Sequence, residues 1–168
     1  MLSNIVHRPV TPEDVPVISE LHSRVFGPGR FARTAYRVRE QIGNGAEISR
    51  FCLIAESDGR MIAALRMSDV AIGGVKGPLL LGPIVVDPEF TNQGYGRALI
   101  GNVMALARDA GIRLVVLVGD ESYYARFGFK PVKPGHITFP GPVNAARILA
   151  AELQPGALSD FHGCISGA

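Results

Sequence analysis

The chain has 168 residues, of which 47% are hydrophobic and 19% are charged, and its formal net charge is +2. This length fits one domain, residues 1–168, with enough apolar residues for a substantial core. The charge is too small and too dispersed for a nucleic-acid-binding surface. No apolar run reaches the roughly 18 residues that a membrane-spanning helix needs, so we expect no membrane partner.

The N-terminus and the cysteines bear on the cellular compartment. The first ten residues, MLSNIVHRPV, carry His7 and Arg8 where a secretory signal would have an apolar stretch. Cys52 and Cys164 form no metal-ligand motif and are interpreted as buried apolar residues in a reducing compartment. We therefore expect a cytoplasmic protein, with a disulfide or a reactive thiol as the alternatives for the cysteines.

The first predicted elements are a short strand and a helix that begins near Thr11. Thr11 is a suitable N-cap, and Asp14 is the acidic residue of a capping box. Apolar residues then recur at helical spacing as far as Gly27, a residue typical of helix ends. A second, shorter helix is predicted over residues 32–42.

Three strands are predicted next. RFCLIAE (50–56) and RMIAALRMSDVAI (60–72) flank a turn that ends in Gly59, which predicts a hairpin. The third, PLLLGPIVV (78–86), is apolar throughout and so is expected to be a central strand buried on both faces. Pro83 removes one ladder donor inside that strand, which favours a bulge.

The third strand is separated from the second by two predicted breaks, at Gly73–Gly74 and at Gly77–Pro78. After it, residues 94–111 have helical periodicity and IRLVVLVG (112–119) is another apolar strand. A strand, a helix and a strand in this order predict a right-handed unit with parallel strands. The predicted apolar stripe of the helix consists of Leu99, Val103, Leu106 and Ala110.

The C-terminal part is predicted less regularly. ESYYARFG (121–128) is a short helix, and residues 129–142 form a loop or an edge strand. A helix is expected over residues 144–153 and a last strand over 158–165. The element order predicts an α/β or α+β fold with a mostly mixed sheet.

The stretch VVDPEFTNQGYGRALIG (85–101) places glycines where a buried strand hands over to a helix. A helix N-terminus presents N–H groups without helical partners, and Gly94 and Gly96 would let a phosphate approach them closely. The alternative is that these glycines only make a tight turn and close packing. A phosphate-binding P-loop is excluded because its lysine is missing, and a dinucleotide fingerprint because Leu99 replaces its third glycine.

LGPIVVDPEFTNQGYGRALI (81–100), followed after a strand by YYARFGF (123–129), resembles the GNAT superfamily of N-acetyltransferases. Together with VLVGDESYYARFGFKPV (116–132) and LAAELQPGAL (149–158), it is most similar to the YhbS-like branch. The resemblance implies a twisted mixed sheet flanked by helices, in which two parallel central strands splay apart. Acetyl-CoA would lie in the cleft between them as a co-substrate.

The resemblance also implies roles for individual residues. The strand from Ile84 to Val86 would pair its backbone with the pantetheine arm of acetyl-CoA. The loop and helix start would hold the pyrophosphate, and Tyr124, in a Y-x-x-x-G-F pattern, would lie near the thioester sulfur. The implied cofactor-binding residues are Ile84, Val85, Val86, Asn92, Gln93, Gly94, Tyr95, Gly96, Arg97 and Ala98.

The sequence departs from the family pattern at Thr91. The usual motif is R/Q-x-x-G-x-G/A, and at its set distance from the V-x-P segment Thr91 takes the first position and Asn92 replaces a frequent glycine. A shifted match that begins at Gln93 would break the distance to Pro88. The unshifted register keeps the backbone cradle and removes one polar side chain from the cofactor site.

Acetyl transfer needs a neutral amine, a stabilised oxyanion and a protonated leaving thiolate. Tyr124 is the predicted general acid, because a tyrosine hydroxyl is protonated at neutral pH; Ser122 and Tyr123 are weaker candidates. A backbone N–H near Val85 is the predicted oxyanion donor. The strand before the loop carries no carboxylate, so a water chain or an amine that arrives neutral would also serve. The candidates for a general base are Glu121, Asp69, Glu56, His136 and His162.

The resemblance favours an N-acetyltransferase that acts on a primary amine of a small molecule or a protein by direct transfer. A non-catalytic module that binds or senses acetyl-CoA is the alternative, and transfer of a longer acyl group is a third option. The histidines lack metal-ligand spacing, so no metal is expected. Proteins of this fold often form homodimers through strands near the C-terminus, and the sequence leaves the oligomeric state of this chain open.

Overall fold

The computed structural model describes residues 5–26 and 51–168. The predicted helix over residues 32–42 and the predicted helix end at Gly27 lie outside these ranges. The described strands are β1 (Val6–Pro9), β2 (Leu53–Ser57), β3 (Arg60–Ile72), β4 (Val75–Val86), β5 (Leu114–Val118), β6 (Lys130–Pro131), β7 (Ile137–Thr138), β8 (Ile148–Glu152) and β9 (Gly163–Gly167). The α-helices are α1 (Val15–Phe26), α3 (Tyr95–Asp109) and α4 (Glu121–Tyr124), and the 3-10 turns are η1 (Pro12–Asp14), η4 (Pro88–Phe90), η5 (Ala125–Phe127), η6 (Ala145–Arg147) and η7 (Ala157–Asp160).

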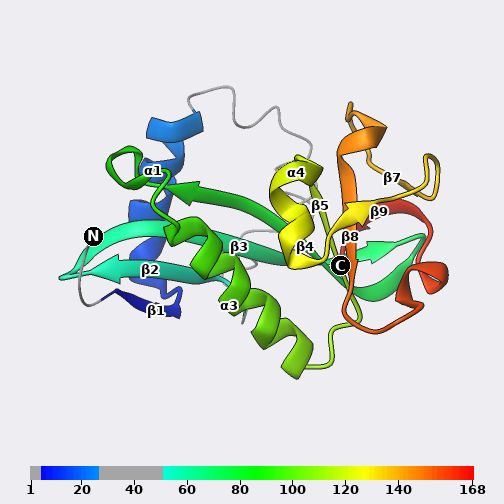
Figure 1. Ribbon diagram of the computed structural model, residues 1–168, viewed down its shortest axis with the longest axis horizontal. Coiled ribbons are helices and arrows are strands. Elements are labelled where there is room, and N and C mark those ends of the chain that lie inside the picture. Colours follow the sequence, from blue (N-terminus) through cyan, green and yellow to red (C-terminus); the bar gives the residue numbers. More distant parts are fainter. Residues whose placement is uncertain (1–4, 27–50) are drawn as a thin grey trace.

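The strands form one mixed sheet in the order β1-β2-β3-β4-β5-β8-β6, and β9 pairs with β3 and β7. Side chains point to alternate faces along each strand, and helices pack against the apolar side chains on both faces of this sheet. On one face, Leu53 and Ala55 of β2 share a core cluster with α3. On the other, Cys52 and Ile54 pack with Leu21 of α1. Figure 1 shows α3 and α1 on opposite sides of the strands.

The two parallel strands β4 and β5 pair along only part of their length. Their register joins Leu79 with Val115 and Leu80 with Val116, and no further pair follows. Beyond this point β4 continues to Val86 paired with β3 alone, whereas β5 remains paired with β8 over its whole length. The expected splay of two parallel central strands is therefore confirmed, and among the described residues no strand pairs with the β5-facing edge of β4 beyond Leu80.

The turns and irregularities of the β2–β3–β4 region are explained by single residues. Asp58 and Gly59 have φ of 51° and 79°, as a two-residue hairpin turn requires. Near Pro83 the β3–β4 register shifts between Leu65 and Met67, so the predicted bulge is confirmed. The predicted break at Gly77–Pro78 is wrong, because β4 already begins at Val75. A second register shift in the β3–β4 pair, between Asp69 and Ala71, accommodates Pro78, which cannot donate a hydrogen bond to the ladder.

Helix α3 forms as predicted, but it buries a different stripe. Leu106 is 41% exposed and Ala110 is exposed; their predicted burial is wrong. A Cβ placed on Gly96 would lie only 3.2 Å from Cγ2 of Val86. This close approach sets which face of α3 meets the sheet. The buried residues of α3 are Gly96, Leu99, Ile100, Val103, Met104 and Ala107.

The C-terminal prediction is wrong in type. Residues 144–153 form the turn η6 and the strand β8, not a helix. Leu149 packs in the cluster beneath α3, and Ile148 and Ala150 pack on the opposite face. Because β8 lies between β5 and β6 and is buried on both faces, tertiary packing overrides the weak helix preference of this alanine-rich run. The last strand predicted over 158–165 is present but begins later, as β9, and η7 occupies the first part of the predicted range.

The two cysteines differ in exposure. Cys52 is 1% exposed and lies in the core on the α1 face, as predicted. Cys164 is exposed, so its predicted burial is wrong, and the two cysteines form no disulfide with each other. Cys164 lies on β9, which pairs with β3 at the end of the sheet, where one face of a strand remains open to solvent.

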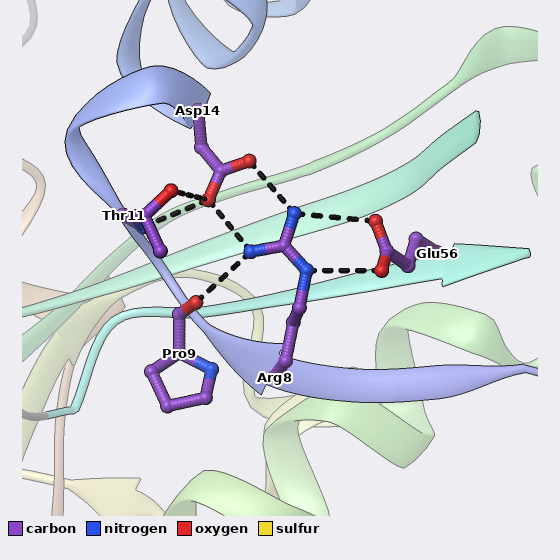
Figure 2. Close-up of polar contacts among 5 residues, drawn as sticks. All are labelled: Arg8, Pro9, Thr11, Asp14 and Glu56. Carbon is purple, nitrogen blue, oxygen red and sulfur yellow. Dashed lines mark hydrogen bonds and ion pairs between the residues drawn. The ribbon is translucent and has the colours of Figure 1, made fainter. Parts of the chain in front are cut away.

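Arg8 ties β1 to β2 and to the start of α1 (Figure 2). Its guanidinium donates to both carboxylate oxygens of Asp14 at 2.8 Å and to Glu56 at 2.9 and 3.2 Å. Asp14 also accepts from the backbone N–H and the hydroxyl of Thr11 at 2.8 and 2.9 Å. The acidic residue of the predicted capping box therefore bonds back to its N-cap, and the same carboxylate holds the first strand in place.

Replacing Asp14 by asparagine is expected to remove a pH-dependent part of the stability. The hydrogen bonds from Arg8 lower the pKa of Asp14 from 3.8 to about 2 despite its burial. A lowered carboxyl pKa stabilises the fold above pH 4, and that contribution disappears as the pH falls towards 2. In urea unfolding, the free energy of unfolding of the wild type should exceed that of Asp14→Asn by about 2 kcal/mol at pH 6. This difference should close near pH 2.

The control for this measurement is Asp160→Asn. Asp160 also pairs with an arginine, Arg113, at 2.6 Å, but its side chain is 57% exposed. An exposed pair contributes about 1 kcal/mol or less. A gap for Asp14→Asn that stays constant from pH 6 to pH 2 would contradict the role assigned to Arg8.

Candidate functional site

The site lies where β4 ends and the chain turns into α3. Asp87 follows the strand directly and is 2% exposed. One carboxylate oxygen accepts the backbone N–H of Glu89 at 3.0 Å, which caps the turn η4. Burial alone raises the pKa of Asp87, but the Glu89 N–H and the Arg60 guanidinium outweigh it and lower the pKa. The carboxylate is therefore a charged anchor at the base of the loop.

The loop reaches α3 through two left-handed residues, Asn92 with φ of 60° and Gly94 with φ of 88°. Apart from its chain neighbours and its own helix, a Cβ on Gly94 would meet no atom of the described residues within 4 Å, so this backbone is open toward the part of the chain that the structure describes. The N–H of Ala98 donates to the carbonyl of Gly94 at 3.0 Å, which is the first bond of the helical ladder. The amides of the turn before it therefore belong to the positive end of the helix, while that of Ala98 is already used.

The two glycines at the start of α3, the N-cap Gly94 and the helical Gly96, thus serve different purposes. Gly96 is buried, and a Cβ on it would lie 3.2 Å from Val86, 3.6 Å from Ile84 and 3.8 Å from the hydroxyl of Tyr123. The interpretation as close packing fits this glycine. Gly94 combines a positive φ with open space, which is the arrangement that admits an anion to a helix N-terminus.

A cavity of about 510 Å³ opens at this helix start. The described residues that line it come from the end of β4, the loop, the first turn of α3 and α4. Arg97 is the cation among them, and none of these described residues is a carboxylate. The cavity therefore favours an anionic ligand. The lining residues are Val86, Phe90, Thr91, Asn92, Gln93, Gly94, Tyr95, Gly96, Arg97 and Tyr123.

The loop side chains bond back to the turn before them. The hydroxyl of Thr91 donates to the carbonyl of Pro88 at 3.3 Å, and the amide of Gln93 donates to the carbonyl of Glu89 at 3.3 Å. Thr91, which departs from the family pattern, therefore stabilises the shape of the loop. Because both side chains bond to the backbone of η4, their main role is to hold the shape of the loop that lines the cavity.

Two adjacent tyrosines of α4 have different places. Tyr123 lines the cavity, whereas Tyr124 does not belong to the described lining. The half-buried Tyr124 ring packs edge-on against Tyr123 and Phe129, with ring centres 4.9 and 6.0 Å apart. A Cβ on Gly119 would lie 2.5 Å from Cε2 of Tyr124. The absence of a side chain at Gly119 makes room for the tyrosine beside the end of β5.

The remaining predicted cofactor residues lie around the cavity rather than in its lining. Val85 is 1% exposed and packs on the α1 face with Cys52. Ile84 is half-buried beside Gly96. Ala98 is exposed, and its N–H belongs to the helix ladder.

Two candidates for the general base are engaged elsewhere. Glu56 accepts from Arg8, and Nε2 of His136 lies 2.9 and 3.0 Å from the carbonyls of Leu158 and Phe161. Glu121, Asp69 and His162 are exposed. Within residues 5–26 and 51–168, no three His, Cys, Asp or Glu side chains gather as metal ligands. In the same ranges, no helix has the length and apolar character to cross a membrane.

Two residues at the site, Phe90 and Arg60, were not predicted from the sequence. Phe90 lines the cavity, and its place inside the glycine-containing motif, between Pro88 and Thr91, was the available signal. The guanidinium carbon of Arg60 lies 4.8 Å from the centre of the Phe90 ring. Arg60 is distant in sequence, and no local pattern marks it.

Comparison with known proteins identifies the family of this arrangement. The family model described as an acetyltransferase (GNAT) domain matches residues 49–131. Two Escherichia coli K12 relatives are similar in sequence, the uncharacterized N-acetyltransferases YjhQ and YhbS. YjhQ is 28% identical over 77% of this chain and 71% of its own length. YhbS is 27% identical over 92% of this chain and 90% of its own.

Solved structures agree with the sequence comparison. The E. coli YhbS structure, a complex with CoA, has a TM-score of 0.79 and 25% identity, and the match covers 98% of this chain and 89% of that one. A GNAT family acetyltransferase from Brucella melitensis, in complex with acetyl-CoA, has a TM-score of 0.71 and 27% identity over 98% of this chain and 96% of its own. The predicted family resemblance and the predicted mixed-sheet fold are confirmed.

Proposed function

The chain belongs to the GNAT acetyltransferase family, and we propose that it transfers the acetyl group of acetyl-CoA directly to a primary amine of a small molecule or a protein. The observation that carries this proposal is the cavity at the N-terminus of α3, at the end of β4 and beyond its last pair with β5. It combines a helix N-terminus with a strand edge, and acetyl-CoA has a part for each: a pyrophosphate and an amide-rich arm.

The residues present fit this co-substrate. Gly94 leaves the helix start open, Arg97 contributes positive charge to the lining, and the volume of about 510 Å³ lies in the range of small-molecule sites. On its β5 side, the edge of β4 from Gly82 to Val86 pairs with no strand of residues 5–26 and 51–168, and it offers backbone groups to the arm. The complexes of YhbS with CoA and of the Brucella protein with acetyl-CoA support the same assignment.

Bound acetyl-CoA supplies the acetyl group as a thioester. The amine nitrogen forms a bond to the carbonyl carbon, and the carbon–sulfur bond then breaks. We assign to backbone N–H groups near Val85 the stabilisation of the carbonyl oxygen, and to the hydroxyl of Tyr124 the proton that the leaving sulfur takes up. The proton lost by the amine passes to water or to an exposed carboxylate such as Glu121, since Glu56 and His136 are held in structural contacts.

A second candidate function is acetyl-CoA binding without turnover. The observation that favours it is the place of the two tyrosines, because Tyr123 lines the cavity while the proposed acid Tyr124 lies beside it. The two functions make different demands on the chain. Binding requires only the helix start and the strand edge, whereas transfer also requires a proton donor within reach of the sulfur.

The deciding experiment measures CoA release from acetyl-CoA across a panel of small amines, amino acids and N-terminal peptides, beside calorimetric binding of acetyl-CoA. Release stimulated by one class of amine would establish the transferase and its acceptor class. Tight binding without release for any member would favour the sensor function. Absence of binding would contradict both. Replacing acetyl-CoA by longer acyl-CoA thioesters in the same assay tests the third option, transfer of a longer acyl group.

Gly119→Ala is expected to lower turnover without weakening acetyl-CoA binding. The new Cβ would lie 2.5 Å from Cε2 and 3.0 Å from Cδ2 of Tyr124, so the ring must move and carries its hydroxyl with it. A displacement of about 1 Å at a catalytic group costs about 100-fold in rate. The measurement is kcat with the best amine of the panel, together with the Kd for acetyl-CoA. A variant with wild-type kcat would separate Tyr124 from the reaction.

A further inference from the structure

Arg60 contacts the segment that leads into the cavity, although it lies outside the cavity lining itself. It is the first residue of β3, directly after the hairpin turn. Its guanidinium lies 3.3 Å from the carboxylate of Asp87 and 2.5 Å from that of Glu89. The guanidinium carbon lies 4.8 Å from the centre of the Phe90 ring. The side chain of Arg60 thus contacts three of the four residues 87–90, which connect β4 to the loop.

Asp87 makes this contact more than a surface ion pair. Its carboxylate is almost fully buried and accepts the backbone N–H of Glu89, and its own N–H donates to the carbonyl of Ile62 at 2.8 Å. A buried carboxylate is costly unless cations and donors compensate it. Arg60 donates a hydrogen bond to it, whereas Arg24 of α1 stands at 3.7 Å, beyond hydrogen-bonding distance. Of these two arginines, Arg60 is thus the one that lies closer to the buried carboxylate of Asp87.

Phe90 carries the contact into the cavity. Its ring lies under the guanidinium of Arg60, an arrangement that attracts a cation to an aromatic face. The same ring meets Tyr95, the first residue of α3, edge-on at 6.1 Å between centres. Both aromatic residues line the cavity. A continuous set of contacts therefore runs from Arg60 through Phe90 to the first turn of α3.

We propose that Arg60 is a positioning residue for the acetyl-CoA site, which sets the path of residues 87–94 and thereby presents the first turn of α3 to the pyrophosphate. This inference rests on the proposed function, since it concerns how the same cavity is kept in shape. Arg60 belongs to a different hairpin from the loop, so it acts on the ligand only through Asp87, Glu89 and Phe90. Its loss should affect binding of the co-substrate and leave the chemical step intact.

The test is Arg60→Met, which keeps an unbranched apolar stem and removes the guanidinium. The Arg60 side chain is 50% exposed, so the variant should fold. We expect the Kd and the KM for acetyl-CoA to rise about tenfold, with kcat at saturating acetyl-CoA unchanged. Arg60→Lys, which restores one charged contact but not the planar fork, should recover part of the affinity. A Kd equal to that of the wild type would overturn the inference.

Arg113→Met is the matched control. Arg113 is 40% exposed, pairs with Asp160 at 2.6 Å and lies 5.6 Å from the centre of the Phe161 ring. It therefore repeats the arrangement of an arginine, a carboxylate and a phenylalanine at a place outside the described cavity lining. Arg60→Met should lose more thermal stability than Arg113→Met, because Asp87 is buried whereas Asp160 is exposed. At a temperature where both variants are folded, we expect only Arg60→Met to lose affinity. An equal loss of affinity in Arg113→Met would overturn the inference.

A double variant separates position from charge. Removing Arg60 takes one positive charge from beside the carboxylates of Asp87, which keeps Arg24 at 3.7 Å, and Glu89. This change alone could weaken binding at the proposed phosphate site, and Arg60→Met/Glu89→Gln cancels the change in net charge. If the double variant stays about tenfold weaker than wild type, the loop position is the cause. Full recovery of affinity would overturn the positioning role. If Gly94→Asp weakens binding but Arg60→Met does not, this inference alone fails, whereas a wild type that does not bind acetyl-CoA removes the proposed function as well.

Discussion

Replacing Gly94 by aspartate is expected to raise the Kd for acetyl-CoA about 100-fold, the largest loss of binding that we predict for any single variant. The new carboxylate would stand at the open N-terminus of α3, in the space where a Cβ meets no atom within 4 Å. There it would take the place of an anionic ligand and repel its phosphates. Calorimetric titration of acetyl-CoA into wild type and variant measures the difference directly.

Gly111 supplies the matched control at the other end of the same helix. Its φ of 84° is close to the 88° of Gly94, and a Cβ there also meets nothing within 4 Å. Gly94→Asp and Gly111→Asp thus share the cost of a left-handed side chain, about 1 kcal/mol, and the same added charge. Only the first should lose affinity. Gly94→Asn, which is uncharged and tolerates a positive φ, should stay within a few-fold of wild type. Equal affinities for wild type and Gly94→Asp would contradict the phosphate site.

Tyr124→Phe is expected to lower kcat about 100-fold and to leave the Kd for acetyl-CoA unchanged. In the proposed mechanism the hydroxyl donates its proton only as the carbon–sulfur bond breaks, so its removal raises the barrier without affecting the bound ground state. The ring packs against Tyr123 and Phe129, and phenylalanine preserves that packing. Steady-state kinetics with the amine found in the panel gives kcat and both KM values.

Tyr123→Phe is the companion variant, because Tyr123 lines the cavity from the neighbouring position. Its hydroxyl approaches Gly96, near the proposed pyrophosphate site, so its loss should raise the KM for acetyl-CoA more than it lowers kcat. The opposite result, a loss of kcat in Tyr123→Phe and none in Tyr124→Phe, would assign the proton donor to Tyr123. Wild-type kinetics in both variants would exclude a tyrosine acid and favour protonation by water.

Local signals in the sequence located the elements that build the site. The turn at Asp58–Gly59, the helix from Tyr95 to Asp109 and the short helix before Gly128 all appear where turn residues and apolar periodicity placed them. Each of these signals acts within a few residues, through a positive φ or a helical repeat. For this reason the loop between β4 and α3, and the pattern that resembles the GNAT family, could be predicted from the amino-acid sequence alone.

Long-range burial decided what the local patterns could not. The run from Ile148 to Ala151 has no period that distinguishes a helix from a strand buried on both faces, and its place between β5 and β6 made it β8. The stripe of α3 passes through Ala107 and leaves Leu106 exposed. The angle at which a helix meets a sheet depends on close contacts such as that of Gly96 with Val86, which a helical repeat does not contain.

The resemblance to the family, the loop and the positions of its glycines follow from the amino-acid sequence, because backbone conformation at a turn depends on the residues in that turn. Only the tertiary structure separated Gly94, open to a ligand, from Gly96, closed by packing. It alone brought Arg60 of another hairpin onto Asp87 and Phe90, and placed Tyr123 rather than Tyr124 in the lining. These are contacts between segments distant along the chain, and they form only when the sheet brings those segments together.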